Sequence, residues 1–102
     1  MQKETLATHF GYDSIAGYGT MAVPIYQSTA FNFGTSKKAA DRFALRDLGP
    51  IYSRLTNPTT DILEARLAAL ENGKAAIAVA SGQAAIFFAV ANLAAAGENI
   101  II

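Results

Sequence analysis

The sequence predicts an α/β fold organised around a strand, a tight turn and a helix within residues 75–96. Residues 75–80 alternate alanine with β-branched residues, which favours a short buried strand. Turn residues then interrupt the apolar run at positions 81–83, and helix-forming residues follow them. Residues 100–102, three isoleucines, are typical of a second buried parallel strand. Together these elements predict one βαβ unit with a right-handed crossover.

The same stretch has an alternative interpretation as one apolar span, because about 20 apolar residues cross a bilayer. Neither flank carries a cluster of basic residues: Lys74 stands alone before the run and Glu98 follows it. The charge asymmetry typical of membrane spans is therefore missing. We favour the strand, turn and helix, with Gly97 as the C-terminal stop of the helix.

Composition limits the classes of function. A chain of 102 residues forms one domain at most, and 52% of its residues are hydrophobic, above the usual share. Zero net charge gives no reason to expect nucleic acid or an anionic membrane as partner. The absence of cysteine excludes disulfides and thiolate metal sites. His9 is the only histidine, and no nucleophile elbow surrounds Ser81, so a catalytic triad is not expected.

The two ends of the chain lead to two further expectations. The N-terminus lacks the basic-then-apolar pattern of a signal peptide, so a cytoplasmic protein is expected. The chain stops inside the predicted strand at residues 98–102, and an uncovered apolar strand exposes a sticky edge. We therefore expect an N-terminal piece of a longer protein, or one half of a split one.

The first part of the chain is predicted to be a loop-rich arm. Residues 1–33 show little helical period, and Pro24 argues against a central strand. Ser36 is a suitable N-cap for a helix over residues 37–48, which Gly49 would end.

A second helix is predicted from Pro58 to about Glu71. Asn57 is a favourable N-cap, Pro58 suits the first helical position, and Gly73 would close the helix. Its apolar stripe consists of Leu63, Leu67 and Leu70, helped by Ile62.

Two groups of residues are candidates for binding an anion. A glycine turn at a helix N-terminus presents unpaired N–H groups and the positive end of the helix dipole, and Ser81 adds a hydroxyl. The turn matches neither common glycine-rich phosphate motif, so a ligand-free connection explains it equally well. Tyr52 and Arg54 lie two apart in a predicted extended segment and would share a face. They could clamp a phosphate, although a surface ion pair and aromatic packing explain these two residues better.

Several motifs of the chain occur together in one order and spacing. They are residues 4–9 (ETLATH), 23–29 (VPIYQST), 52–59 (YSRLTNPT), 63–71 (LEARLAALE) and 78–85 (AVASGQAA). Over essentially the whole chain they resemble the Cys/Met-metabolism family of pyridoxal-phosphate enzymes. The SGQAA form of the turn is similar to the O-acetylhomoserine sulfhydrylase branch of that family.

The resemblance implies a fold, a cofactor and partners. The fold would be the N-terminal arm plus the first βαβ unit of a fold-type I PLP-dependent transferase large domain, incomplete here. Residues 1–56 would form the arm and a helix with intersubunit contacts, and residues 57–102 the start of the PLP-binding domain. The remaining enzyme chain and further copies, arranged as a dimer of dimers, would be the partners, with no nucleic acid and no membrane.

The resemblance also implies roles for individual residues. Gly82 and Gln83 would donate backbone N–H groups to the phosphate of pyridoxal 5'-phosphate, and Ser81 would shape the turn. Tyr52 and Arg54 would bind the phosphate of the neighbouring subunit's cofactor. The cofactor-binding lysine would lie downstream, so no catalytic residue is expected in this segment.

The activity that the resemblance implies is γ-replacement on a small-molecule amino-acid substrate. Sulfide would displace acetate from O-acetyl-L-homoserine to give homocysteine. The alternatives are cystathionine γ-synthase and methionine or cystathionine γ-lyase of the same family. A further alternative is a non-catalytic fragment that only binds partner chains and a phosphate group.

Overall fold

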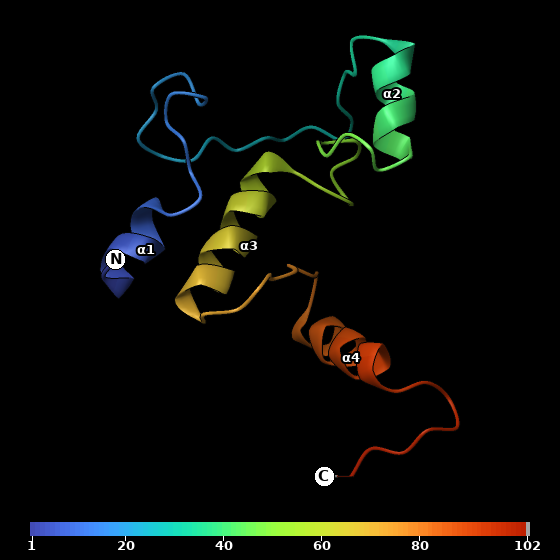
Figure 1. Cartoon of the computed structure of the whole chain (residues 1–102). Coiled ribbons are helices and arrows are strands. Elements are labelled where there is room, and N and C mark those ends of the chain that lie inside the picture. The colour runs from blue at the N-terminus through green and yellow to red at the C-terminus, as the bar shows by residue number, and fades with distance from the viewer. Residues whose placement is uncertain (102) are drawn as a thin grey trace.

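A computed structural model describes residues 1–101 of the chain. In order, its helices are α1 (Lys3–His9), α2 (Ser36–Phe43), α3 (Pro58–Leu70) and α4 (Gly82–Leu93). Within the described part of the chain, α1 and α3 are the only helices that pack against each other. Helices α2 and α4 lie at opposite ends of the molecule, joined to α3 by irregular segments (Figure 1).

Side-chain caps begin three of the helices. Asn57 accepts a hydrogen bond of 2.9 Å from the N–H of Thr59 at the start of α3, which confirms the predicted cap. Thr35 caps α2, so the predicted cap at Ser36 is wrong by one residue. The reason is that the Thr35 hydroxyl, one residue earlier, accepts from Lys38 at 3.2 Å.

Two helices end earlier than their sequences indicate. Helix α2 stops at Phe43 rather than near residue 48, because Leu45 adopts a left-handed φ of 56° that a right-handed helix cannot contain. Helix α4 stops at Leu93 rather than near residue 96, because Ala94 is extended. Gly97 does adopt a left-handed φ of 94°, but it lies beyond the helix end.

Helix α1 corrects the prediction of an irregular arm over residues 1–33. The helix lies against α3, and Arg66 donates a hydrogen bond of 2.8 Å to the carbonyl oxygen of Phe10 just after α1. Gly11 has a φ of 77°, and a Cβ added there would lie 3.2 Å from the Cβ of Ala65. A tertiary contact made at a small residue therefore supports a helix that the local sequence pattern does not indicate.

The predicted strands and their βαβ unit do not form a sheet within residues 1–101. The structure has one isolated antiparallel bridge there, between Ala30 and Tyr52, and residues 75–80 have no strand partner. A strand requires ladder hydrogen bonds to a neighbour, and no other described segment supplies them. Residues 98–101 are also irregular, and Ile102 of the second predicted strand lies outside the described residues.

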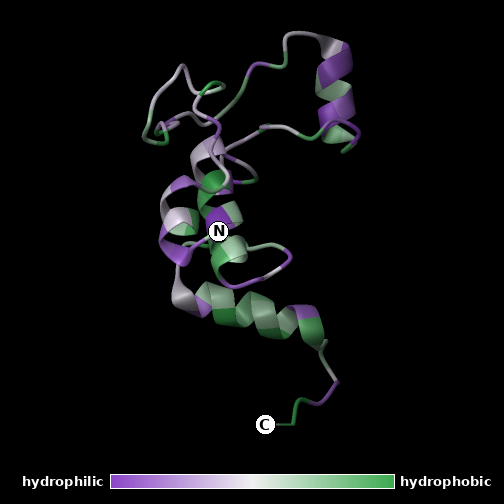
Figure 2. Ribbon diagram, turned by 60° about the vertical axis from the view of Figure 1, so that its left-hand side comes forward, coloured by the Kyte–Doolittle hydropathy of each residue, from purple (hydrophilic) through white to green (hydrophobic). Residues whose placement is uncertain are grey.

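No apolar side chain is buried within the described residues. Helix α4 is hydrophobic around its circumference (Figure 2), yet Phe87 and Leu93 are 65% and 82% exposed. The predicted leucine stripe of α3 is only partly covered: Leu63 and Leu67 are 49% and 45% exposed, and Leu70 is half-buried. The radius of gyration is 16.8 Å, against roughly 13 Å for a compact domain of this length. The apolar faces of this chain therefore lack packing partners.

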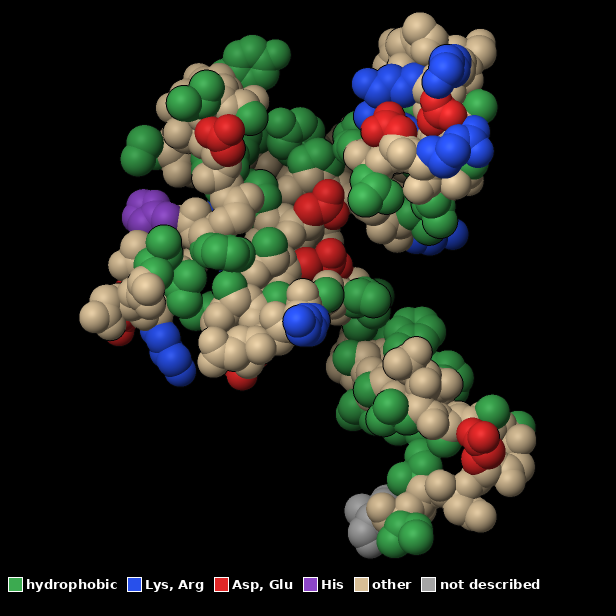
Figure 3. All heavy atoms as spheres, viewed as in Figure 1, with side chains coloured by type: hydrophobic (Ala, Val, Ile, Leu, Met, Phe, Trp, Pro, Cys, Tyr) green, Lys and Arg blue, Asp and Glu red, His purple; other side chains and the backbone are tan. Residues whose placement is uncertain are grey.

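Charged side chains of both signs gather on α2 and the residues just after it (Figure 3). Asp41 pairs with Lys37 at 2.7 Å and with Arg46 at 2.9 Å. These two cations, Lys37 first, hold the pKa of the Asp41 carboxyl below its ordinary value. Within residues 1–101 no helix combines the length and the apolar character needed to cross a bilayer.

Candidate anion-binding site

The turn that begins α4 leaves two backbone donors free. Ser81 is extended, with φ −155° and ψ 157°, and its side-chain oxygen accepts from the N–H of Ala84 at 3.2 Å. Its carbonyl oxygen accepts from Ala85 at 3.1 Å. The N–H groups of Gly82 and Gln83 precede any intrahelical acceptor, and no described residue accepts from them. The first turn of α4 thus presents two parallel donors at the positive end of the helix dipole.

The space in front of this turn is open. A Cβ added to Gly82 would meet no atom within 4 Å, so a ligand can approach the backbone there closely. The segment before the turn is attached to α3, because the carboxylate of Glu64 accepts from the N–H of Ala78 at 2.7 Å. This bond positions the approach to Ser81 without using the donors of the turn.

Tyr52 and Arg54 come together in a way that differs from the prediction. The segment that carries them is a turn rather than an extended strand, because Leu55 and Thr56 both donate to the carbonyl oxygen of Tyr52, at 2.8 Å and 3.1 Å. The guanidinium carbon of Arg54 lies 5.8 Å from the centre of the Tyr52 ring, a cation–π geometry. Both residues are exposed, so a phenol and a guanidinium form one polar patch that an anion can reach.

Asn57 holds this turn in place, a role that sequence reasoning missed. It is 7% exposed, the only buried polar side chain among residues 1–101. Its Nδ2 donates to the carbonyl oxygen of Tyr26 at 2.9 Å and to Oγ of Ser53 at 3.0 Å. The spacing of Ser53 and Asn57 could have suggested the contact, but the cap at Asn57 already explained the residue.

The two candidate groups do not form one site within the chain. No hydrogen bond joins the Tyr52–Arg54 pair to residues 81–83 in the described structure. Arg54 does line a hollow together with Ile77, Ala78 and Val79, shortly before the turn. Arg54 thus lies beside the segment that leads to the turn, and neither Tyr52 nor residues 81–83 line this hollow.

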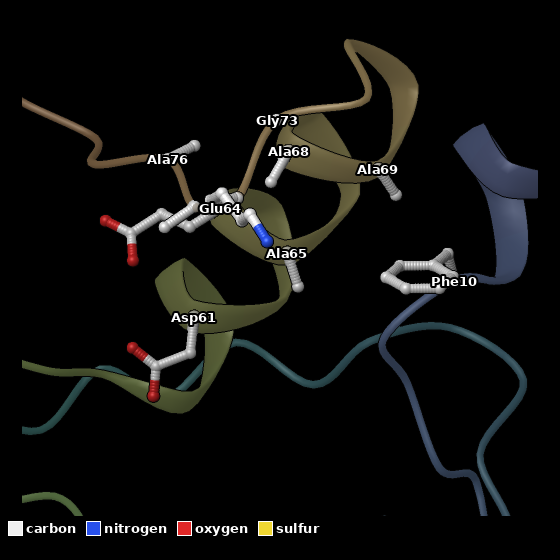
Figure 4. A pocket seen from close by; sticks show the side chains of 10 residues that line it. Phe10, Asp61, Glu64, Ala65, Ala68, Ala69, Gly73 and Ala76 are labelled. Carbon is white, nitrogen blue, oxygen red and sulfur yellow. The ribbon is translucent and has the colours of Figure 1, made fainter.

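A second hollow contains none of the five predicted residues. It lies between Phe10, helix α3 and residues 73–76. Figure 4 shows the Phe10 ring facing Ala65 and Ala69, while the carboxylates of Asp61 and Glu64 lie at the other side. The described residues contain no cluster of His, Asp or Glu suited to a metal ion. We interpret this hollow as part of the packing between the arm and α3.

Comparison with known proteins gives consistent matches. Residues 4–102 match the family described as Cys/Met metabolism PLP-dependent enzyme. The chain is 52% identical over 101 residues to O-acetyl-L-homoserine sulfhydrylase 1 of Thermus thermophilus, covering 99% of this chain and 24% of that protein. It is 53% identical over 98 residues to O-acetyl-L-homoserine sulfhydrylase of Corynebacterium glutamicum, covering 96% and 22%.

A solved structure agrees with these sequence matches. It is the crystal structure of an O-acetylhomoserine (thiol)-lyase from Campylobacter jejuni that carries N'-pyridoxyl-lysine-5'-monophosphate. The TM-score is 0.90 at 52% identity, over 96% of this chain and 24% of that one. The chain thus spans about a quarter of the length of the proteins it matches.

Proposed function

Because this chain belongs to the Cys/Met metabolism PLP-dependent enzyme family, we propose that it supplies the cofactor-phosphate contacts of an O-acetylhomoserine sulfhydrylase. The observation that carries the proposal is the first turn of α4, where Gly82 and Gln83 present free N–H groups beside Ser81. The high identity to two sulfhydrylases across nearly the whole chain favours this branch of the family.

The donors present fit pyridoxal 5'-phosphate. A phosphate dianion needs several N–H or O–H donors and positive charge, and the turn supplies both. We propose that Gly82 and Gln83 donate to the phosphate and that Ser81 shapes the turn. Tyr52 and Arg54, exposed and not bonded to this turn, would bind the phosphate in a neighbouring subunit. The cofactor, when bound, supplies an electron sink for chemistry at the amino-acid substrate.

The whole protein is proposed to have the architecture that the resemblance implies. Residues 1–56 would form the arm with its intersubunit contacts, and residues 57–102 the start of the PLP-binding domain. Residues 75–80 would become a strand of the βαβ unit once a neighbouring strand pairs with them. The uncovered faces of α3 and α4 support this, since they need packing partners. From the resemblance we also propose a dimer of dimers and a cytoplasmic location.

The proposed reaction is γ-replacement, in which sulfide replaces acetate on O-acetyl-L-homoserine and homocysteine forms. None of the five candidate residues holds or moves a proton in this proposal. They bind and orient the phosphate end of the cofactor. The catalytic groups would come from other parts of the whole protein.

The test is an assay of the whole protein, loaded with pyridoxal 5'-phosphate, with O-acetyl-L-homoserine and sulfide. We expect homocysteine and acetate in equal amounts. Parallel reactions with cysteine in place of sulfide, and with methionine alone, check for cystathionine synthesis and for γ-elimination. Cystathionine or a keto acid as the main product would replace the sulfhydrylase assignment with a family alternative, and no turnover of any substrate would contradict an enzyme function.

A further inference from the structure

We propose that Asn57 is a positioning residue for phosphate recognition, acting through the turn that carries Tyr52 and Arg54. The inference rests on the proposed function of that pair. It goes further because it assigns a role to a residue that contacts neither the phosphate nor either member of the pair by a side-chain hydrogen bond.

The carboxamide of Asn57 joins three segments of the chain. Its Oδ1 accepts from Thr59 at 2.9 Å in the first turn of α3, and its Nδ2 donates to Tyr26 in the arm and to Ser53. Both Nδ2 hydrogens and the oxygen are thereby used, and the side chain is 7% exposed. Only an amide offers two donors and an acceptor on so short a side chain.

Ser53 transmits this anchoring because it lies between Tyr52 and Arg54 in the sequence. Its N–H donates to the carbonyl oxygen of Thr29 at 2.9 Å, and its hydroxyl donates to the carbonyl oxygen of Ser28 while accepting from Asn57. The residue between the two anion-binding side chains is therefore fixed at three points. The directions of the phenol and the guanidinium follow from a backbone that Asn57 holds.

Thr59 adds a parallel connection between α3 and the arm. Its hydroxyl donates to the carbonyl oxygen of Pro24 at 2.8 Å and accepts from the N–H of Tyr26 at 2.9 Å. The arm therefore stays attached to α3 when Asn57 is altered. A change at Asn57 should loosen the Tyr52–Arg54 turn more than it loosens the arm.

The variant Asn57→Asp separates the two roles of the residue. A carboxylate keeps the acceptor that caps α3 but has no donor for Tyr26 and Ser53, and it places negative charge beside the Tyr26 carbonyl. Ser53→Ala is the second variant, because it removes the link to Asn57 and leaves the cap intact. Asn32→Asp is the matched control, since exposed Asn32 only accepts from Gly34 and a carboxylate accepts equally well.

The experiment measures the affinity of the whole protein for pyridoxal 5'-phosphate and for pyridoxal, which lacks the phosphate. We expect Asn57→Asp and Ser53→Ala to weaken pyridoxal phosphate binding by about tenfold and to leave pyridoxal binding nearly unchanged. Asn32→Asp should change neither affinity. In a background that combines Tyr52→Phe with Arg54→Ala, Asn57→Asp should cause little further loss, because both groups that it positions are already absent.

The outcomes distinguish this inference from the proposed function. If Arg54→Ala leaves pyridoxal phosphate affinity unchanged, the proposed function of the pair is wrong. If Arg54→Ala weakens binding but neither Asn57→Asp nor Ser53→Ala does, the positioning role is wrong and the proposed function stands. Equal losses of pyridoxal and pyridoxal phosphate affinity would show a general structural role instead and would also overturn the inference.

Discussion

Gly82 is the first residue of α4. Its N–H is one of two at this turn that donate a hydrogen bond to no described residue. The residue before it, Ser81, has φ −155° and ψ 157°, which is also the conformation that precedes proline most readily. Proline is well tolerated at the first position of a helix. The backbone donor of Gly82 can therefore be removed while the helix is kept.

We predict that Gly82→Pro weakens binding of pyridoxal 5'-phosphate to the whole protein by about tenfold or more, because a hydrogen bond to a charged phosphate is lost. Isothermal titration of the apoprotein measures the effect. Gln83→Ala is the control: it keeps both N–H groups and shortens only a side chain, so its affinity should match that of the unaltered protein. Equal affinity of Gly82→Pro and the unaltered protein would contradict a role for this donor.

The side chains of Tyr52 and Arg54 lie together as predicted, but the backbone geometry that brings them together is not the predicted one. Alternation along a strand predicts that the two side chains share a face. The structure instead forms a turn closed at the carbonyl oxygen of Tyr52, and the guanidinium lies over the ring. Local spacing was enough to predict that the two side chains lie close together. The turn that brings them together is bonded to the arm through Ser53 and Thr29 and to the start of α3 through Ser53 and Asn57.

At the scale of elements, α1 is the helix that depends most on tertiary contact. It packs against α3, where Gly11 approaches Ala65. Gly11 and Gly34 both have φ 77°, but a Cβ on Gly34 would meet nothing within 4 Å. Alanine at either position would therefore carry the same backbone strain. Only at Gly11 would the added methyl group also contact another residue.

We predict that Gly11→Ala destabilises the docking of α1 more than Gly34→Ala does. Both changes carry the strain of a left-handed alanine, about 1–3 kcal/mol, but only Gly11→Ala also places a methyl group 3.2 Å from the Cβ of Ala65, a tight contact that the arm and α3 must shift to accommodate. Amide hydrogen exchange of residues 3–9 in the whole protein is the measurement. It should speed up clearly in Gly11→Ala and stay near the unaltered rate in Gly34→Ala. The same exchange rate in both variants would show that the contact at Ala65 does not hold α1.

For the whole molecule, the decisive property is the lack of a buried apolar core in the described residues. More than half of the sequence is hydrophobic, yet most of α4 and two leucines of α3, Leu63 and Leu67, remain exposed. Burial of apolar surface is the main favourable term in folding. A chain with this arrangement gains too little from its own contacts to offset its conformational entropy.

We predict that these 102 residues, produced alone, bind hydrophobic dyes and show no cooperative unfolding transition. Thermal melting followed by near-ultraviolet circular dichroism, together with dye fluorescence, measures this. The whole protein is the control, and it should unfold in a cooperative transition and bind no dye. Cooperative unfolding of the isolated segment as a monomer would refute the prediction.

Much of the helical structure and part of the candidate site could be predicted from sequence. The cap at Asn57, the proline at Pro58 and the turn before α4 depend on neighbouring residues, so their local signals were sufficient. The ends of α2 and α4 were misplaced, because a left-handed Leu45 and an extended Ala94 decide them. Propensity does not encode such conformations.

The sequence by itself determined the order of the later helices, the two free donors of the α4 turn and the membership of the family. Each follows from short-range chemistry or from a pattern of residues along the chain. The tertiary structure alone decided the helical state of residues 3–9, the bonds that tie Ser53 and Asn57 to the arm at Thr29 and Tyr26, and the absence of a sheet among residues 1–101. These features depend on contacts between residues far apart in sequence, and a strand exists only where another strand lies beside it.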